Sequence, residues 1–250
     1  MVWKKCDPFL LGRKYKSWRE FYQVKQKFCT IDHHPFYRMA GKYLPNDKNG
    51  IILDIGSGEG DFVVHLNLTK KYKNIFLLDK NPLTIERLKN RFKNGINTIL
   101  YKAPEKIPLK AASVNYIHCS HIMEHLYHHE FYQLLKEMDR VLATNGILVI
   151  STPLLWDGFY GDISHIKPYN PWVFYKYLCV EPHNFSQEDI SQKYVILDLE
   201  FRYFSYEFDD SWGSEYRFFD LILYFFKKIL SKLKIKKYEK NGFTMVLKKL

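Results

Sequence analysis

The stretch Ile-Ile-Leu-Asp-Ile-Gly-Ser-Gly-Glu-Gly-Asp-Phe, residues 51–62, decides the fold of this chain. Its apolar start ends at Asp54, and glycine then recurs at positions 56, 58 and 60 before an apolar, helix-like spacing resumes. Glycine lets a backbone turn sharply and pass close to a ligand. The stretch therefore predicts a buried strand that turns directly into a helix, with a loop that can hold a nucleotide-like cofactor. The dinucleotide fingerprint is a poorer match, because it needs glycine at the sixth position, which here is Asp61.

Further strands and helices are predicted along the rest of the chain. Apolar runs at residues 74–78, 98–101, 114–119 and 147–151 are separated by helical patterns. Strands that alternate with helices predict a parallel sheet with helical crossovers. After them, residues 194–207 and 242–248 are predicted to be strands. Helices are predicted over residues 15–28, 35–44, 171–178 and 216–235.

The glycine loop and the acids around it carry a resemblance to a known family. Asp54 followed by the tight glycine pattern resembles motif I of class I S-adenosylmethionine (SAM)-dependent methyltransferases. Asp79 ends the second apolar run nineteen residues after Gly60, and an acid at this place holds a pair of ribose hydroxyls. Over about residues 45–185 the order and spacing are similar to the small-molecule and glycan O-methyltransferases that include the ubiquinone-pathway enzymes. The resemblance implies an α/β fold: a seven-stranded, mostly parallel, doubly wound (Rossmann-like) sheet with its last strand antiparallel.

The resemblance also implies a cofactor site. Ligands of open α/β sheets bind beyond the carboxyl ends of the strands, so we expect SAM at that edge, with its methionine moiety on the glycine loop and its ribose on Asp79. Two positions depart from the family, since Lys102 and Asn115 stand where acids are common. The residues predicted to bind SAM are Asp54, Gly56, Ser57, Gly58, Gly60, Asp79, Lys80, Ala103 and Ser120.

A histidine-rich segment after the fourth apolar run is the candidate for chemistry. His121, Glu124 and His125 occupy positions i, i+3 and i+4, so they would share one face of a helical turn. His165 follows forty residues after His125 in an Asp-x-x-His-x-basic-Pro-aromatic pattern. In related methyltransferases this pattern closes over the substrate, and Glu-x-x-Glu-His with a later His binds a divalent metal that holds the acceptor hydroxyl. Here His121 replaces the first Glu of that motif.

Three interpretations of this segment stay open. In the first, His121, Glu124, His125 and His165 bind a divalent metal, and this donor set would suit Zn, Fe, Ni or Mn better than Mg. In the second, Glu124 and His125 shape a turn while His165 is a metal-free general base. In the third, all of them are structural. The first two make His165, His125 and Glu124 the predicted catalytic residues.

Chain length and cysteine content indicate the number of domains and the cellular compartment. A chain of 250 residues with 46% apolar residues can bury a full core, so we expect one domain. Residues 1–48 would be lid helices, residues 49–153 the cofactor-binding core, and residues 154–250 the substrate loop, the terminal strands and a basic helix at 216–237. Four cysteines without metal or disulfide spacing, and a start without an apolar signal segment, are typical of a cytoplasmic protein.

The positive charge is concentrated at one end of the chain. Residues 227–250 hold nine lysines and one glutamate, which supply +8 of the net +11. A nucleic-acid groove would spread its charge over a face, so nucleic acid is not an expected partner. A basic amphipathic helix at residues 216–237 with an aromatic stripe predicts peripheral contact with the inner face of a membrane. A helix packed on the sheet with solvated lysines is the other interpretation.

The predicted function is methylation of a hydroxyl group. Motifs for nucleobase methylation are absent, since Ser120-His121-Ile122-Met123 stands where amino-methylating DNA enzymes have Asp/Asn-Pro-Pro-aromatic, and no cysteine follows a proline. The resemblance implies a SAM-dependent O-methyltransferase acting on a small molecule or a lipid-linked glycan, with a role in polysaccharide biosynthesis. The alternatives are an RNA ribose 2′-O-methyltransferase and a non-catalytic SAM-binding partner subunit.

Overall fold

A computed structural model of the chain describes residues 23, 25–93, 95–179, 187–206 and 236–250. They build one seven-stranded sheet with the strand order β3-β2-β1-β4-β5-β7-β6. The strands β1 to β5 are parallel, and β7 runs antiparallel to both of its neighbours. The predicted fold class is therefore confirmed. The strands are β1 Ile51–Ile55, β2 Asn74–Asp79, β3 Asn97–Leu100, β4 Val114–Ser120, β5 Leu142–Pro153, β6 Tyr194–Tyr206 and β7 Lys237–Lys249.

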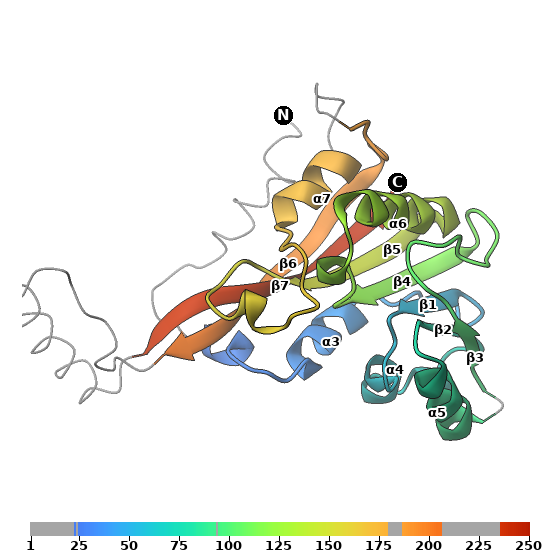
Figure 1. The fold of residues 1–250 in the computed structure, drawn as a ribbon. Helices are drawn as coiled ribbons and strands as arrows, with labels where there is room; N and C mark the ends of the chain where they lie inside the picture. The colour runs from blue at the N-terminus through green and yellow to red at the C-terminus, as the bar shows by residue number, and fades with distance from the viewer. Residues whose placement is uncertain (1–22, 24, 94, 180–186, 207–235) are drawn as a thin grey trace, which may run out of the picture.

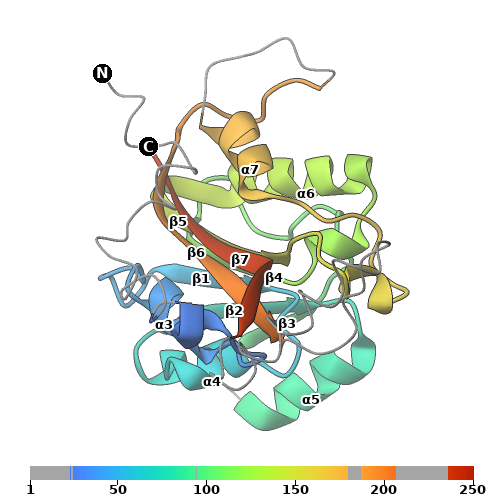
Figure 2. The same cartoon turned by 90° about the vertical axis from the view of Figure 1, so that its left-hand side faces the viewer.

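Helices cover both faces of the sheet. Figures 1 and 2 both show α6 and α7 on one side and α3, α4 and α5 on the other. The helices are α3 His34–Gly41, α4 Asp61–His65, α5 Pro82–Phe92, α6 His128–Val141 and α7 Pro171–Leu178, with the short 3₁₀ helices η2 Leu68–Lys70, η3 Met123–His125 and η4 Phe159–Gly161.

The central strand β1 shows why the sheet takes this form. Successive side chains of a strand point to opposite faces, and here both faces are covered. Leu53 and Ile55 pack into the core beneath α6 and α7, whereas Ile52 packs into the core beneath α3, α4 and α5. A strand buried on both faces is apolar without alternation, which is how this run reads in the sequence. The polar Asp54 is the exception, and it belongs to the site.

Some predictions about individual elements need correction or lie outside the described residues. The fifth strand begins at Leu142, five residues before the predicted start, because its first part also pairs with β4. The predicted helix over residues 216–235, and most of that over 15–28, lie outside the described residues. The membrane contact assigned to residues 216–237 thus stays a prediction. No helix within the described ranges has the length and hydropathy that a membrane span requires.

Candidate active site

The glycine loop between β1 and α4 has the sharp geometry that the sequence predicts. The φ angle of Gly58 is 50° and that of Gly60 is 77°, in the left-handed region that glycine alone adopts freely. A Cβ atom at Gly58 would meet nothing within 4 Å, whereas one at Gly60 would lie 2.7 Å from the ring of Phe92. Gly58 therefore leaves open space beside the loop, and Gly60 permits close packing of the loop on α5.

Asp79 lies at the end of β2, opposite the glycine loop. One of its carboxylate oxygens accepts a hydrogen bond from the N–H of Gly58 at 3.0 Å, and the other accepts from the N–H of Asn81 at 2.9 Å. Each carboxylate oxygen has two acceptor positions, so both can still accept from hydroxyl groups of a ligand. The predicted ribose-binding acid is thus fixed in position by the loop that it faces.

A cavity of about 400 Å³ opens at this edge of the sheet, within the usual size of small-molecule sites. Lys102 lines it where relatives commonly have an acid, so this wall offers a cation to a ligand. The glycine cradle, the acid and the cavity fit a nucleotide-like cofactor such as SAM. Ser57, Gly58 and Gly60 belong to the loop that borders the cavity, and Ser120 ends β4 next to it. The predicted cofactor residues that line the cavity directly are Gly56, Asp79, Lys80 and Ala103.

Asp54 does not line the cavity; it is buried beneath the loop. Its Oδ1 lies 2.7 Å from Nδ1 of His118, and the side chains are 2% and 3% exposed. The ring of Phe62 stacks on the imidazole with the centroids 3.9 Å apart. No short-range pattern in the sequence pairs His118 with an acid. Parallel pairing of the two predicted strands would have predicted this contact, because Asp54 of β1 lies opposite His118 of β4.

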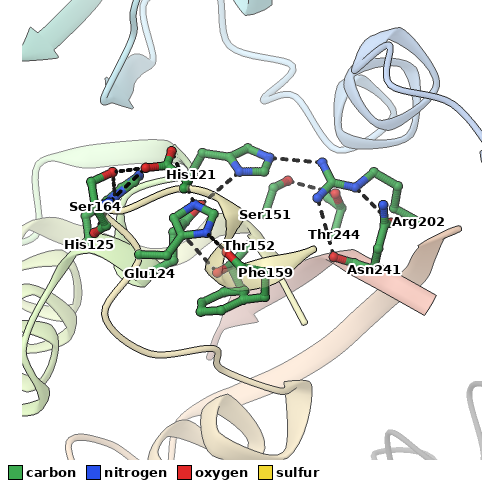
Figure 3. A network of polar contacts seen from close by, with 12 residues as sticks. His121, Glu124, His125, Ser151, Thr152, Phe159, Ser164, Arg202, Asn241 and Thr244 are labelled. Atoms are coloured by element: carbon green, nitrogen blue, oxygen red, sulfur yellow. Dashed lines mark hydrogen bonds and ion pairs between the residues drawn. The ribbon is translucent and has the colours of Figure 1, made fainter. Parts of the chain in front are cut away.

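The segment after β4 does not form the predicted helical turn. His121 has a φ of 56° and stands before η3, which includes only Met123 to His125. The N–H of His121 donates to the carbonyl of Ser151 at 2.9 Å. Figure 3 shows His121 turned toward Arg202 and His125 turned toward Ser164, on opposite sides of Glu124. The prediction that His121, Glu124 and His125 share one face is therefore wrong.

Glu124 is the buried centre of the site. It has no exposed surface, Oε1 lies 2.9 Å from Nδ1 of His121, and Oε2 accepts from the hydroxyl of Thr152 at 3.2 Å. Burial raises the pKa of Glu124, but the hydrogen bond from His121, together with a backbone hydrogen bond, outweighs it and holds the pKa below its ordinary value. Glu124 is therefore a carboxylate at neutral pH.

His125 and His165 meet Glu124 from the other side. The three residues offer ligand atoms that all lie within 4.8 Å of one another. Nδ1 of His125 lies 3.1 Å from the carbonyl oxygen of Ser164, and Nδ1 of His165 lies 2.7 Å from that of Phe159. A carbonyl oxygen only accepts, so each Nδ1 carries the hydrogen and each Nε2 keeps a lone pair.

The loop that carries His165 is held against the same residue. The N–H of Ile166 donates to the backbone carbonyl of Glu124 at 2.7 Å, and Ser164 donates through its hydroxyl to Asp162 at 2.6 Å. These bonds place the loop after β5 over the segment after β4. The structure therefore brings together three of the four residues predicted as metal ligands: Glu124, His125 and His165.

His121 is kept outside this group by Arg202, which the sequence analysis did not single out. Nη1 of Arg202 on β6 lies 3.3 Å from Nε2 of His121. A guanidinium only donates, so Nε2 accepts and Nδ1 donates to Glu124. Both nitrogens of His121 are thus engaged, and neither is free for a metal. In the sequence, Arg202 is one polar residue in an alternating strand, 81 positions away, and gives no signal of its own.

Comparisons with known proteins agree with this geometry. Residues 53–150 match a family described as a methyltransferase domain. An uncharacterized chloroplastic methyltransferase of Arabidopsis thaliana is 22% identical over 183 residues, which are 70% of this chain and 48% of that protein. The chain thus spans about half the length of this curated relative.

Solved structures share the fold over nearly their full length. A SAM-dependent methyltransferase from Archaeoglobus fulgidus is 19% identical with a TM-score of 0.54, covering 92% of this chain and 99% of that one. The YcgJ protein from Bacillus subtilis is 13% identical with a TM-score of 0.59, covering 87% and 98%. A geranyl diphosphate methyltransferase in complex with SAM is 9% identical with a TM-score of 0.56, covering 98% and 92%. Residues 53–150 thus match a methyltransferase domain, and the solved structures share the fold of the sheet in which these residues lie.

Proposed function

We propose that this protein transfers the methyl group of SAM to a hydroxyl of a small molecule or a glycan. The observation that carries the proposal is the convergence of Glu124, His125 and His165 beside the cofactor cavity, which His125 also lines. A hydroxyl must lose its proton when it is methylated, and an imidazole with a free lone pair is the usual group that accepts it. The site offers two such imidazoles and a carboxylate.

A side chain of this site would accept the proton that the acceptor hydroxyl loses. SAM, when bound, supplies an already activated methyl group. Nε2 of His165 is the proton acceptor, because the carbonyl of Phe159 holds the hydrogen on Nδ1. Once Nε2 takes the proton, the imidazolium is stabilised by the ionised Glu124 nearby.

The same donor set also fits a divalent transition metal. Two imidazoles have their Nδ1–H fixed by backbone carbonyls, which is how metal-binding histidines are commonly oriented, and Glu124 adds a carboxylate. Such an ion would hold the acceptor hydroxyl and lower its pKa. Elemental analysis and activity after exhaustive chelation separate the two versions. Full activity without metal leaves His165 as the base, and loss of activity that Zn, Fe, Ni or Mn restores favours the ion.

The proposal is tested by a screen of glycans, phenols and RNA with radiolabelled SAM. His165→Ala should lower kcat by at least about 100-fold, the usual contribution of a general base. His129→Ala is the control, because its exposed side chain lies at the start of α6 and its loss should leave kcat unchanged. If the label enters only RNA, the proposal is wrong and the protein is a ribose 2′-O-methyltransferase. SAM binding without methylation of any acceptor would point to a non-catalytic subunit.

A further inference from the structure

A second cavity, of about 390 Å³, lies beside the active site along the C-terminal end of β6. We name it the Arg202 cavity. Its aromatic wall is continuous, since the rings of Trp156 and Phe204 lie 5.3 Å apart. None of the described residues that line it is acidic. Its lining includes Trp156, Arg202, Phe204, Ser205 and Asn241.

The guanidinium of Arg202 has no carboxylate partner among the residues that the structure describes, where no ion pair within 4.0 Å includes it. Glu124 is the acid whose charge acts on Arg202, and His121 lies between the two side chains. Burial lowers the pKa of Arg202, so the charge is largely removed from water. A desolvated cation without a counter-ion is unfavourable, and a bound anion would remove that cost.

Arg202 also keeps hydrogen-bonding capacity. A guanidinium has five N–H donors. Three are used: Nε donates to Oδ1 of Asn241 at 3.1 Å, Nη2 to the carbonyl of Asn241 at 3.5 Å, and Nη1 to His121 at 3.3 Å. Two donors therefore remain on a side chain that Asn241 holds in position. A planar donor pair of this kind matches the oxygens of a phosphate or a carboxylate.

We propose that the Arg202 cavity binds an anionic group, a phosphate or a carboxylate, of the methyl acceptor. The proposal rests on the proposed function, because it names the acceptor's chemistry. His121 lines the cofactor cavity and contacts Arg202, so an anion on Arg202 lies one side chain away from the cofactor. Trp156 and Phe204 then pack against the body of the acceptor. An acceptor anchored in this way presents its hydroxyl toward Glu124, His125 and His165.

Calorimetry of the full chain with inorganic pyrophosphate and with malonate tests the binding step. Wild type should bind one or both. Arg202→Met should weaken that binding by about tenfold or more, as expected for loss of charge-assisted hydrogen bonds. Binding of pyrophosphate alone identifies a phosphorylated acceptor, and binding of malonate alone identifies a carboxylate. No binding of either probe by wild type, or equal binding by Arg202→Met, overturns the proposal.

Two further variants keep the test decisive if Arg202→Met does not fold. Ser205→Asp places a carboxylate in the lining of the cavity and should abolish anion binding while Arg202 is retained. Lys240→Gln is the matched control, because it removes a positive charge next to Asn241 on β7 from a residue outside the cavity lining. Its anion affinity should stay within about twofold of wild type. Loss of binding in Lys240→Gln equal to that in Ser205→Asp would mean a diffuse charge effect and overturn the proposal.

SAM affinity, measured separately on each variant, distinguishes this proposal from the proposed function. Ser205→Asp should bind SAM as wild type does, because Ser205 neither lines the cofactor cavity nor contacts His121. Wild type that binds pyrophosphate but not SAM would contradict the proposed function alone. Labelled methyl transfer to a sugar and to its phosphate completes the test. In a wild type that binds pyrophosphate, preference for the neutral sugar over its phosphate would overturn the anionic acceptor.

Discussion

Replacing His118 by phenylalanine should destabilise the protein by about 3 kcal/mol. The substitution keeps an aromatic ring against Phe62, where the imidazole now stacks at 3.9 Å and 6°. It removes only the 2.7 Å hydrogen bond to Asp54 and leaves that side chain, 2% exposed, without its partner. A hydrogen bond to a charged group contributes about 1.5–3 kcal/mol, and a buried acid left unpaired costs about 3–5 kcal/mol. The two ranges meet at about 3 kcal/mol, which is the destabilisation expected for His118→Phe.

Thermal unfolding of His118→Phe measures this cost. In a chain of this size each kcal/mol shifts Tm by about 2–4 °C, so a fall of about 6–12 °C is expected. His129→Phe is the control, since this exposed histidine pairs with no acid among the described residues. This variant should stay within about 0.5 kcal/mol of wild type. A fall in Tm below about 2 °C for His118→Phe would show that Asp54 does not depend on His118. SAM affinity should weaken as well, because the pair lies beneath the glycine loop.

Three further outcomes are expected. Gly58→Arg should reduce SAM affinity at least about tenfold by calorimetry, because its side chain fills space that the loop leaves open. Gly60→Ala should lower the free energy of unfolding by about 1–3 kcal/mol in urea, because its Cβ would overlap Phe92 at 2.7 Å. Arg140 donates to Glu137 and holds the pKa of that carboxyl below its usual 4.5. This stabilisation is therefore present above pH 4.5 and lost as the pH falls through the lowered pKa. Glu137→Gln should flatten the acid limb of stability against pH, and an unchanged limb would contradict this role.

The sequence was sufficient for those parts of the fold that depend on local patterns. The glycine loop and the strand that ends at Asp79 follow from short apolar runs and from the conformational freedom of glycine. The convergence of His165 with Glu124 followed from the family resemblance, and the structure brings these two residues together. No local sequence pattern predicts the Arg202 cavity, where we propose that the anionic group of the acceptor binds.

Contacts between distant strands decided what the sequence analysis missed. His121 was predicted to join a helical face, but Arg202 and Ser151 hold it in a left-handed turn. Arg202 comes from β6. The helical spacing i, i+3, i+4 of residues 121–125 gives no information about contacts with a strand so far along the chain. The contact of His118 with Asp54 was missed for the same reason, because the two residues are 64 positions apart. Both omissions concern contacts between strands that are distant in the sequence.

The place of β7 between β5 and β6 governs the order in which this protein can assemble on the ribosome. The five strands around the glycine loop emerge first and can pair with one another. β6 emerges next, but its neighbour in the sheet is β7, which follows after residues 207–236. At translation rates of about 5–20 residues per second, about 1.5 to 6 seconds pass before β7 begins to emerge, and during this time the edge of β6 is open to other chains. Variants that slow the pairing of β6 with β7 should therefore lower soluble yield in cells before they lower the melting temperature of the finished protein.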